Sequence, residues 1–125
     1  MTQSKVAIIR TKPETVLDDY ERLFKLADGA KHLDPSITTI LKDNISWHYP
    51  FPSANTTPWQ LEGTVAALQR NAFKKIVCVQ NKTEVTNAYK GERLNLYPPI
   101  FKAYNIEVLF NFKESDMKWV VYKPK

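Results

Sequence analysis

Short apolar runs along the chain alternate with segments of helical periodicity. Five runs predict strands, at residues 5–10, 37–45, 75–80, 106–110 and 119–122. The run at 75–80 is continuously apolar, which is typical of a strand that is buried on both faces of a parallel sheet. The pattern therefore predicts a sheet of four to five strands.

The segments between these runs carry the signals of helices. After the first run, apolar residues recur with a period near 3.6, at Val16, Leu17, Tyr20, Leu23, Phe24 and Ala27. Thr11 and Glu14 have capping-box spacing around Pro13, and Gly29 is placed to end the helix. A second helix is predicted behind the cap Thr57, with an apolar face at Leu61, Val65, Leu68 and Ala72. Residues 98–104 predict a short third helix.

Strands that alternate with helices indicate right-handed crossover connections and a parallel sheet. We therefore predict one α/β domain over residues 1–125, a three-layer open mostly parallel sheet with helices on both faces. The fold would be Rossmann-like without a dinucleotide fingerprint, because the chain has no glycine-rich phosphate loop of either common type. A length of 125 residues suits a single core.

Composition sets limits on location and cofactors. No apolar run approaches the roughly 20 residues that cross a bilayer, and residues 1–5 lead directly into a strand pattern, so we expect a cytoplasmic protein without membrane contact. Cys78 is the single cysteine, which excludes an internal disulfide. Alone it cannot ligate structural zinc or an iron–sulfur cluster, and His32 and His48 form no recognisable metal motif, so we expect neither a metal nor a cofactor in this chain.

The net charge of +5 and a pI near 9.3 favour anionic partners. Lysine and arginine are scattered along the chain and often stand beside acids, as in residues 18–22. Without a basic run or a basic helix stripe, a solvated surface is the better interpretation, and nucleic acid is an unfavoured partner.

Two long polar loops follow the second and third predicted strands, at residues 42–57 and 81–95. Ligands in open α/β sheets gather beyond the carboxyl ends of the strands, and crossover loops rarely need so many residues. The candidate ligand-binding residues are Lys42, Asn44, Ser46, Asn55, Thr56, Thr57, Asn81, Lys82, Thr86 and Asn87.

The hypothesis for this site is a small anionic molecule, bound as part of an enzyme site. Lys42 and the helix start at Thr56 and Thr57 would hold the anionic group, while Asn44, Asn81 and Lys82 would orient it. The same residue types are common in turns and helix caps, so a purely structural use of these loops stays open. His48 is the candidate for acid–base chemistry, and a packed histidine is the alternative.

A second hypothesis makes this a non-catalytic interaction domain. Four aromatic residues lie in or beside the first polar loop, at Trp47, Tyr49, Phe51 and Trp59. A patch of large aromatics is typical of interface cores. They would dock a missing C-terminal half of the protein or a second copy of the chain.

Three segments resemble a known family. Residues 40–49 (ILKDNISWHY), 55–63 (NTTPWQLEG) and 80–91 (QNKTEVTNAYKG) are similar to the N-terminal region of domain-of-unknown-function family 362, in its longer bacterial branch. Asp43 departs from the proline that many relatives carry there. The resemblance implies that this chain corresponds to the N-terminal part of a longer architecture. It also implies that an iron–sulfur cluster would occur only in longer relatives, and it carries over no reaction.

Overall fold

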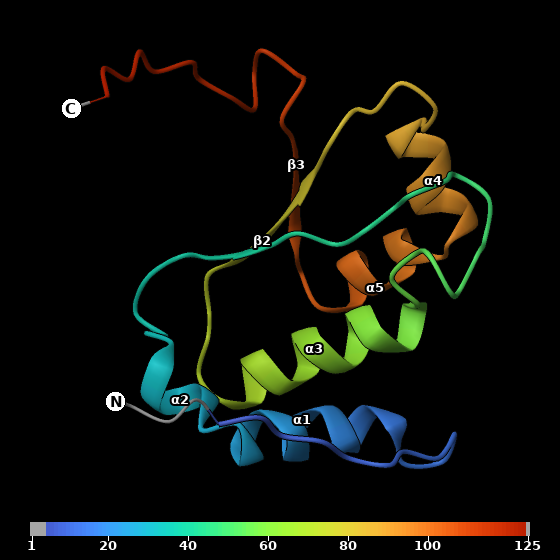
Figure 1. The fold of residues 1–125 in the computed structure, drawn as a ribbon, viewed down its shortest axis with the longest axis vertical. Coiled ribbons are helices and arrows are strands. Elements are labelled where there is room, and N and C mark those ends of the chain that lie inside the picture. The colour runs from blue at the N-terminus through green and yellow to red at the C-terminus, as the bar shows by residue number, and fades with distance from the viewer. Residues whose placement is uncertain (1–4, 125) are drawn as a thin grey trace.

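A computed structural model describes residues 5–124, and it contains one open parallel sheet with helices (Figure 1). The elements in chain order are α1 (Val16–Leu26), α2 (Gly29–His32), β1 (Thr39–Leu41), α3 (Pro58–Arg70), β2 (Ile76–Gln80), α4 (Ala88–Leu94), α5 (Tyr97–Ala103) and β3 (Glu107–Phe110). The strand order is β1-β2-β3, with both pairings parallel. The predicted α/β class with a parallel sheet is therefore confirmed.

The core lies between one face of the sheet and the helices α3 and α5. Its buried side chains come from α3 (Leu61, Val65, Leu68), β2 (Ile76, Cys78) and α5 (Tyr97, Ile100, Phe101). Helix α1 packs on α3, and Gly63 of α3 faces the ring of Tyr20 so closely that a Cβ would lie 2.3 Å from Cδ2. The order of layers is thus sheet, then α3 with α4 and α5, then α1 (Figure 1).

The prediction of helices on both faces of the sheet is not confirmed in the part of the chain that the structure describes. The helices gather on one side of the sheet (Figure 1), and the register places Ile40, Val77 and Val79 on its other face. Ile40 is 65% exposed. The reason is the position of α1, which is bound to α3 instead of the sheet, so that the second face has no helical cover among residues 5–124.

Two segments predicted as strands take no part in the sheet. Residues 5–10 run along α1, with Ala7 and Ile9 half-buried, while Val6 and Ile8 are 81% and 84% exposed. Residues 119–122 also belong to no strand. The described chain therefore has three strands where four or five were expected, because an apolar alternating run forms a strand only where a neighbouring edge is within reach.

Local capping signals explain which helix boundaries were predicted correctly. Thr57 caps α3 as expected, since its side chain accepts a hydrogen bond from the amide of Gln60 at 3.3 Å. Helix α1 begins at Val16 instead of Pro13, and the Thr11 hydroxyl donates to the carbonyl of Lys12 instead of capping. The observed β1 is also shorter than the predicted strand 37–45. Helix α4 was not predicted.

Candidate functional site

The two polar loops meet at the carboxyl ends of β1 and β2, as the topology predicted. They enclose a cavity of about 330 Å³ lined by Lys42, Asn44, Ile45, Ser46, Gln80, Asn81, Thr83, Val85 and Ala88. We call it the β1–β2 cleft. Lys42, Asn44, Ser46 and Asn81 were predicted as ligand-binding residues, and the structure brings these four together in one cavity.

A second cavity adjoins the cleft, because both are lined by Thr83, Val85 and Ala88. It has a volume of about 500 Å³, and its other lining residues are His48, Lys82, Glu84, Thr86, Asn87, Tyr89 and Phe112. Three further predicted ligand-binding residues lie here, namely Lys82, Thr86 and Asn87. The remaining three, Asn55, Thr56 and Thr57, line neither cavity.

Asn55 is a buried hydrogen-bonding centre of the first loop. Its Oδ1 accepts from the backbone amides of Ser46 and Trp47 at 3.0 and 3.2 Å. Its Nδ2 lies within hydrogen-bond distance of the carbonyls of Trp47 and Tyr49 and of the Asn95 side chain. With 5% of its surface exposed, Asn55 holds the loop in shape and ties it to the end of α4.

Other predicted residues also fix the loops. The Asn44 side chain donates to the Ser46 hydroxyl and to the carbonyl of Ala54, and the Asn44 amide donates to the Thr56 hydroxyl at 2.9 Å. The Thr86 hydroxyl donates to the carbonyl of Ser46 at 2.9 Å, which joins the two loops directly. The structural reading of these amides and hydroxyls therefore holds alongside any binding role.

Helix caps account for two more of the predicted residues. Thr57 caps α3, and Asn87 caps α4 by accepting from the amide of Lys90 at 2.9 Å. The start of α3 does not line the cleft, so the expected combination of Lys42 with this helix terminus is not assembled. The anion-binding elements that do meet are Lys42 and the neutral donors of the two loops.

Behind the cleft lie two buried carboxyl groups that the sequence did not single out. Asp43 follows β1, and its Oδ2 accepts from the Gln80 side chain at 2.8 Å and from the Cys78 thiol at 3.4 Å. Glu92 comes from α4 and is also buried. One oxygen of each, Asp43 Oδ1 and Glu92 Oε1, has no hydrogen-bond partner among the described residues.

Burial controls the protonation of Glu92, Asp43 and Cys78. Loss of hydration raises the pKa of Glu92 to about 7, with a further rise from the nearby Asp43 charge and an opposing hydrogen bond to Gln80. Burial also raises the pKa of Asp43, against the hydrogen bonds from Gln80 and Cys78. The Cys78 thiol has its pKa raised by burial and by Asp43, so it is a weak nucleophile.

Some of the residues around the buried carboxyl groups could have been identified from the sequence. Asp43 and Gln80 stand at or beside the carboxyl ends of apolar runs, which is where polar residues of an α/β site are expected. Glu92 could not have been identified in this way, since it belongs to a helix that the apolar pattern does not predict.

His48 lies half-buried at the wall of the second cavity. Its ring centroid is 4.5 Å from that of Tyr49 and 6.0 Å from that of Trp47, and its Nδ1 has no hydrogen-bond partner among the described residues. No carboxylate that would orient the ring for proton transfer is bonded to it in this part of the chain. The packed reading of His48 therefore fits its surroundings.

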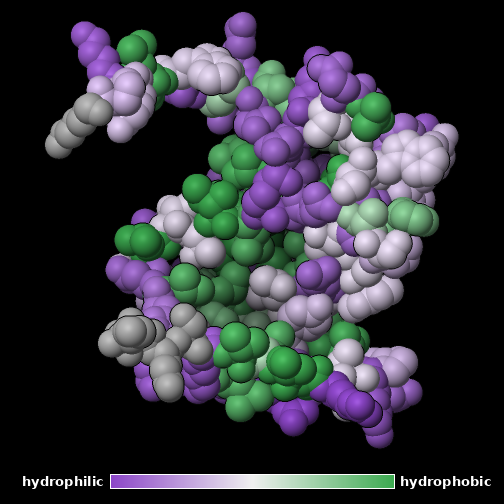
Figure 2. Space-filling view, viewed as in Figure 1, coloured by the Kyte–Doolittle hydropathy of each residue, from purple (hydrophilic) through white to green (hydrophobic). Residues whose placement is uncertain are grey.

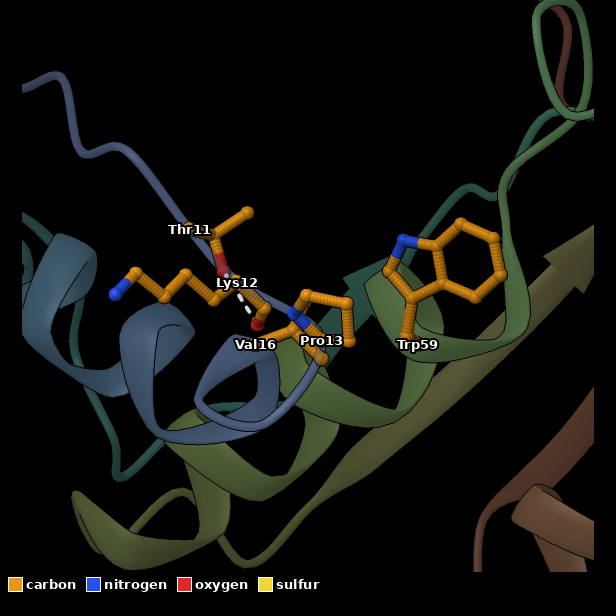
Figure 3. Close-up of a pocket in the computed structure, with 5 residues that line it drawn as sticks. All are labelled: Thr11, Lys12, Pro13, Val16 and Trp59. Atoms are coloured by element: carbon orange, nitrogen blue, oxygen red, sulfur yellow. Dashed lines mark hydrogen bonds between the residues drawn. The ribbon is translucent and has the colours of Figure 1, made fainter.

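A third, mostly apolar cavity lies away from the polar loops, between the start of α1 and the start of α3 (Figure 3). It has a volume of about 380 Å³ and is lined by Thr11, Lys12, Pro13, Val16 and Trp59. The Trp59 indole faces the ring of Pro13 across it (Figure 3). Trp59 is 48% exposed. The three loop aromatics Trp47, Tyr49 and Phe51 are exposed to a similar degree.

Residues 5–124, which the structure describes, contain no group of three or more His, Cys, Asp or Glu side chains that could hold a metal ion. None of the helices in this range has the length and apolar character that a bilayer crossing requires.

Comparison with known protein families, with curated proteins and with solved structures finds no match to this chain. The resemblance to domain-of-unknown-function family 362 stays a prediction from the sequence segments alone.

Proposed function

We propose that the β1–β2 cleft binds a small molecule through a carboxylate, phosphate or sulfate group, as part of an enzyme site. The observation that carries this proposal is the cavity of about 330 Å³ in which Lys42 and the donors of two loops converge. Such a convergence of a few polar groups in a preformed cavity at the strand ends is typical of ligand sites in α/β folds.

The charge of the lining supports an anion. Lys42 supplies a cation, and none of the lining residues that the structure describes is acidic. The Lys42 ammonium donates to the backbone carbonyl of Asp43. Asn81 and Thr83 add neutral donors that can orient oxygen atoms of the ligand. The role proposed for this chain is to hold and orient the anionic group.

Reacting groups for an enzyme would come from the adjoining cavity. His48 and Lys82 line it and do not line the β1–β2 cleft. A ligand held at Lys42 would extend toward them. His48 is the proposed proton-transfer group because imidazole is the side chain that most often transfers protons in enzyme sites.

Thermal melting tests the binding. The purified chain is melted in sulfate, phosphate, acetate and succinate, with chloride at equal ionic strength as the reference, because a ligand that binds the folded state raises Tm. Sulfate also stabilises folded proteins that have no specific binding site. The measured quantity is therefore the difference between variants in the rise of Tm. Lys42→Met is expected to lose the anion-specific rise, while Lys102→Met, an exposed lysine of α5, retains it. An equal rise in both variants would contradict the proposal.

The second candidate function is protein docking through the loop aromatics. It is favoured by the exposure of Trp47, Tyr49 and Phe51, which is 49%, 45% and 53%. Trp47 and Tyr49 pack edge to face at 5.0 Å, and Lys90 lies over the Tyr49 ring, so the patch is ordered before any partner binds. Trp47→Ser together with Phe51→Ser would then weaken association with a partner chain and leave anion binding intact.

A further inference from the structure

The cavity that adjoins the β1–β2 cleft has an aromatic wall that the anion proposal does not use. Tyr89 of α4 and Phe112, which follows β3, both line this cavity of about 500 Å³. Phe112 reaches it because β3 runs parallel to β2, so the chain leaves both strands at the same edge of the sheet. Val85 adds an aliphatic side chain and lines both cavities. The space next to the cleft is therefore walled in part by apolar groups.

The aromatic wall is held in place by a cluster of three rings. The Tyr89 ring centroid lies 4.6 Å from that of Phe110 and 5.9 Å from that of Phe112, and the two phenylalanine centroids are 5.5 Å apart. The Lys113 ammonium lies 4.9 Å from the centre of the Phe110 ring. Tyr89 and Phe112 meet at 83°, which is the edge-to-face geometry that aromatic pairs prefer. These rings are thus ordered before any ligand binds.

Much of this wall is open to a ligand. Tyr89 is 49% exposed, Val85 is 71% exposed, and Phe112 is half-buried. The segments that follow β2 and β3 lie at the upper end of the molecule (Figure 1). In the same view this end of the surface is mostly hydrophilic or neutral, with small separate hydrophobic groups (Figure 2). Small apolar areas in polar surroundings favour a small ligand over a protein partner.

The charges of the two cavities differ. Lys42 is the one lysine, arginine or acidic residue in the described lining of the cleft. The adjoining cavity has Lys82 and Glu84, whose opposite charges offset each other. An anionic group is therefore favoured in the cleft, and an uncharged part of the same ligand is favoured in the adjoining cavity.

Hydrogen bonds fix the lining that the two cavities share. The Thr83 hydroxyl, in the lining of both, accepts from the amide of Thr86 at 3.2 Å. The Thr86 hydroxyl in turn donates to the carbonyl of Ser46 at 2.9 Å. A ligand that spans both cavities would meet a preformed surface, which lowers the entropic cost of binding.

We propose that the ligand of the β1–β2 cleft is an aromatic anion, with its anionic group at Lys42 and its ring against Tyr89 and Phe112. This inference rests on the proposed anion site and adds the chemical class of the ligand. A third ring joins an aromatic cluster by stacked or edge-to-face contact. The volumes of about 330 and 500 Å³ lie in the range of small-molecule sites, which is about 300–1,000 Å³.

Dissociation constants of aryl phosphates test the class of the ligand. They are measured by NMR titration of the full chain at about pH 8, where phosphate monoesters are dianions. Phenyl, benzyl and phenethyl phosphate place the ring at increasing distance from the phosphate, and methyl phosphate is the reference without a ring. The best of the aryl phosphates is expected to bind about tenfold more tightly than methyl phosphate. Cyclohexylmethyl phosphate should gain less, and an equal gain would overturn the aromatic class.

Variants locate the ring. Tyr89→Leu should bring the aryl phosphates to the affinity of methyl phosphate. Tyr122→Leu is the matched control, because this tyrosine is 81% exposed and lines neither cavity, and it should keep the tenfold difference. Lys42→Met should weaken methyl and aryl phosphates alike. In the wild-type chain, nuclear Overhauser contacts should join the ring protons of the bound ligand to Tyr89 and Phe112.

The outcomes separate this inference from the proposed function. Methyl phosphate binding that depends on Lys42, with no gain for any aryl phosphate or with a gain that survives Tyr89→Leu, would overturn the aromatic class and leave the anion site standing. Overhauser contacts of the ring with another surface would do the same. An absence of saturable binding for every phosphate would overturn the anion site and this inference with it.

Discussion

The side-chain amide of Gln80 donates a hydrogen bond to the buried carboxyl group of Asp43 at 2.8 Å, and so joins the end of β2 to the residues that follow β1. Gln80 also lines the β1–β2 cleft. A single buried amide therefore connects the wall of the cleft to the buried carboxyl group of Asp43, whose charge in turn raises the pKa of Glu92 of α4. The first two predictions follow from this arrangement.

Replacing Gln80 with Leu should destabilise the fold by about 1–3 kcal/mol, because a buried carboxyl group then loses a donor that it cannot replace. Gln69→Leu is the matched control. Its amide also donates one hydrogen bond, to the carbonyl of Tyr104, but the residue is exposed and water can take over. Urea unfolding at neutral pH measures both variants, and equal losses would show that burial of the Gln80 bond does not matter.

The free energy of unfolding should fall as pH rises toward and past 7, because of Glu92. Its pKa is about 7 in the folded chain and 4.5 in its ordinary state, so the folded form binds more protons between these values. Stability from this group is complete below pH 4.5, declines as pH rises, and is lost above about pH 7. The difference corresponds to about 3 kcal/mol.

Glu92→Gln should remove this decline, since the amide cannot ionise. Urea unfolding at several pH values between 4.5 and 8 compares the variant with the wild-type chain. Glu114→Gln, at an exposed glutamate, serves as the control and should keep the wild-type slope. A slope that survives in Glu92→Gln would assign the pH dependence to another group.

Replacing Asn55 with Ala should cost about 3 kcal/mol or more. The change leaves the amides of Ser46 and Trp47 and the carbonyl of Tyr49 without their buried partner. It should also raise hydrogen exchange across residues 44–56. Asn81→Ala, at an exposed position, should change stability by less than about 0.5 kcal/mol. A loss confined to stability, with no change in exchange of the loop, would contradict the role given to Asn55.

Gly63→Ala should destabilise by about 1–3 kcal/mol, although alanine usually favours a helix by about 1 kcal/mol. The new Cβ would lie 2.3 Å from the Tyr20 ring, and also close to that residue's Cβ, which has no freedom to move aside. In a Tyr20→Ala background the same change should become neutral or stabilising. Thermal unfolding of the four chains completes the cycle, and additive effects would show that α1 does not pack on α3 as described.

Local signals predicted the elements whose stability is local. The cap at Thr57, followed by Pro58, marked the start of α3, and the apolar run of β2 marked a buried strand. Helix α4 was not predicted because its sequence is polar and contains Gly91. The glycine is explained by the close approach of the Ile45 side chain instead of by helix propensity. The expected strand at 5–10 failed for a related reason, since pairing depends on a partner edge that the local pattern does not supply.

The site was predictable at the level of loops and less so at the level of residues. Parallel topology alone brings Lys42 and Asn81 to one edge of the sheet. The role of Asn55 depends on Asn95, which lies 40 positions away, and a sequence pattern cannot show that contact. A polar side chain in a loop can face the ligand or hold the loop, and the difference is decided by packing.

The most direct test of the anion-binding cleft is an NMR titration of the chain with sulfate against chloride at equal ionic strength. An anion site in the cleft predicts that shifts of the backbone amides concentrate at Lys42, Ser46, Asn81 and Thr83, saturate with one affinity, and disappear in Lys42→Met. Shifts that are spread over the exposed lysines of the whole surface without saturation, or that persist in Lys42→Met, would contradict it.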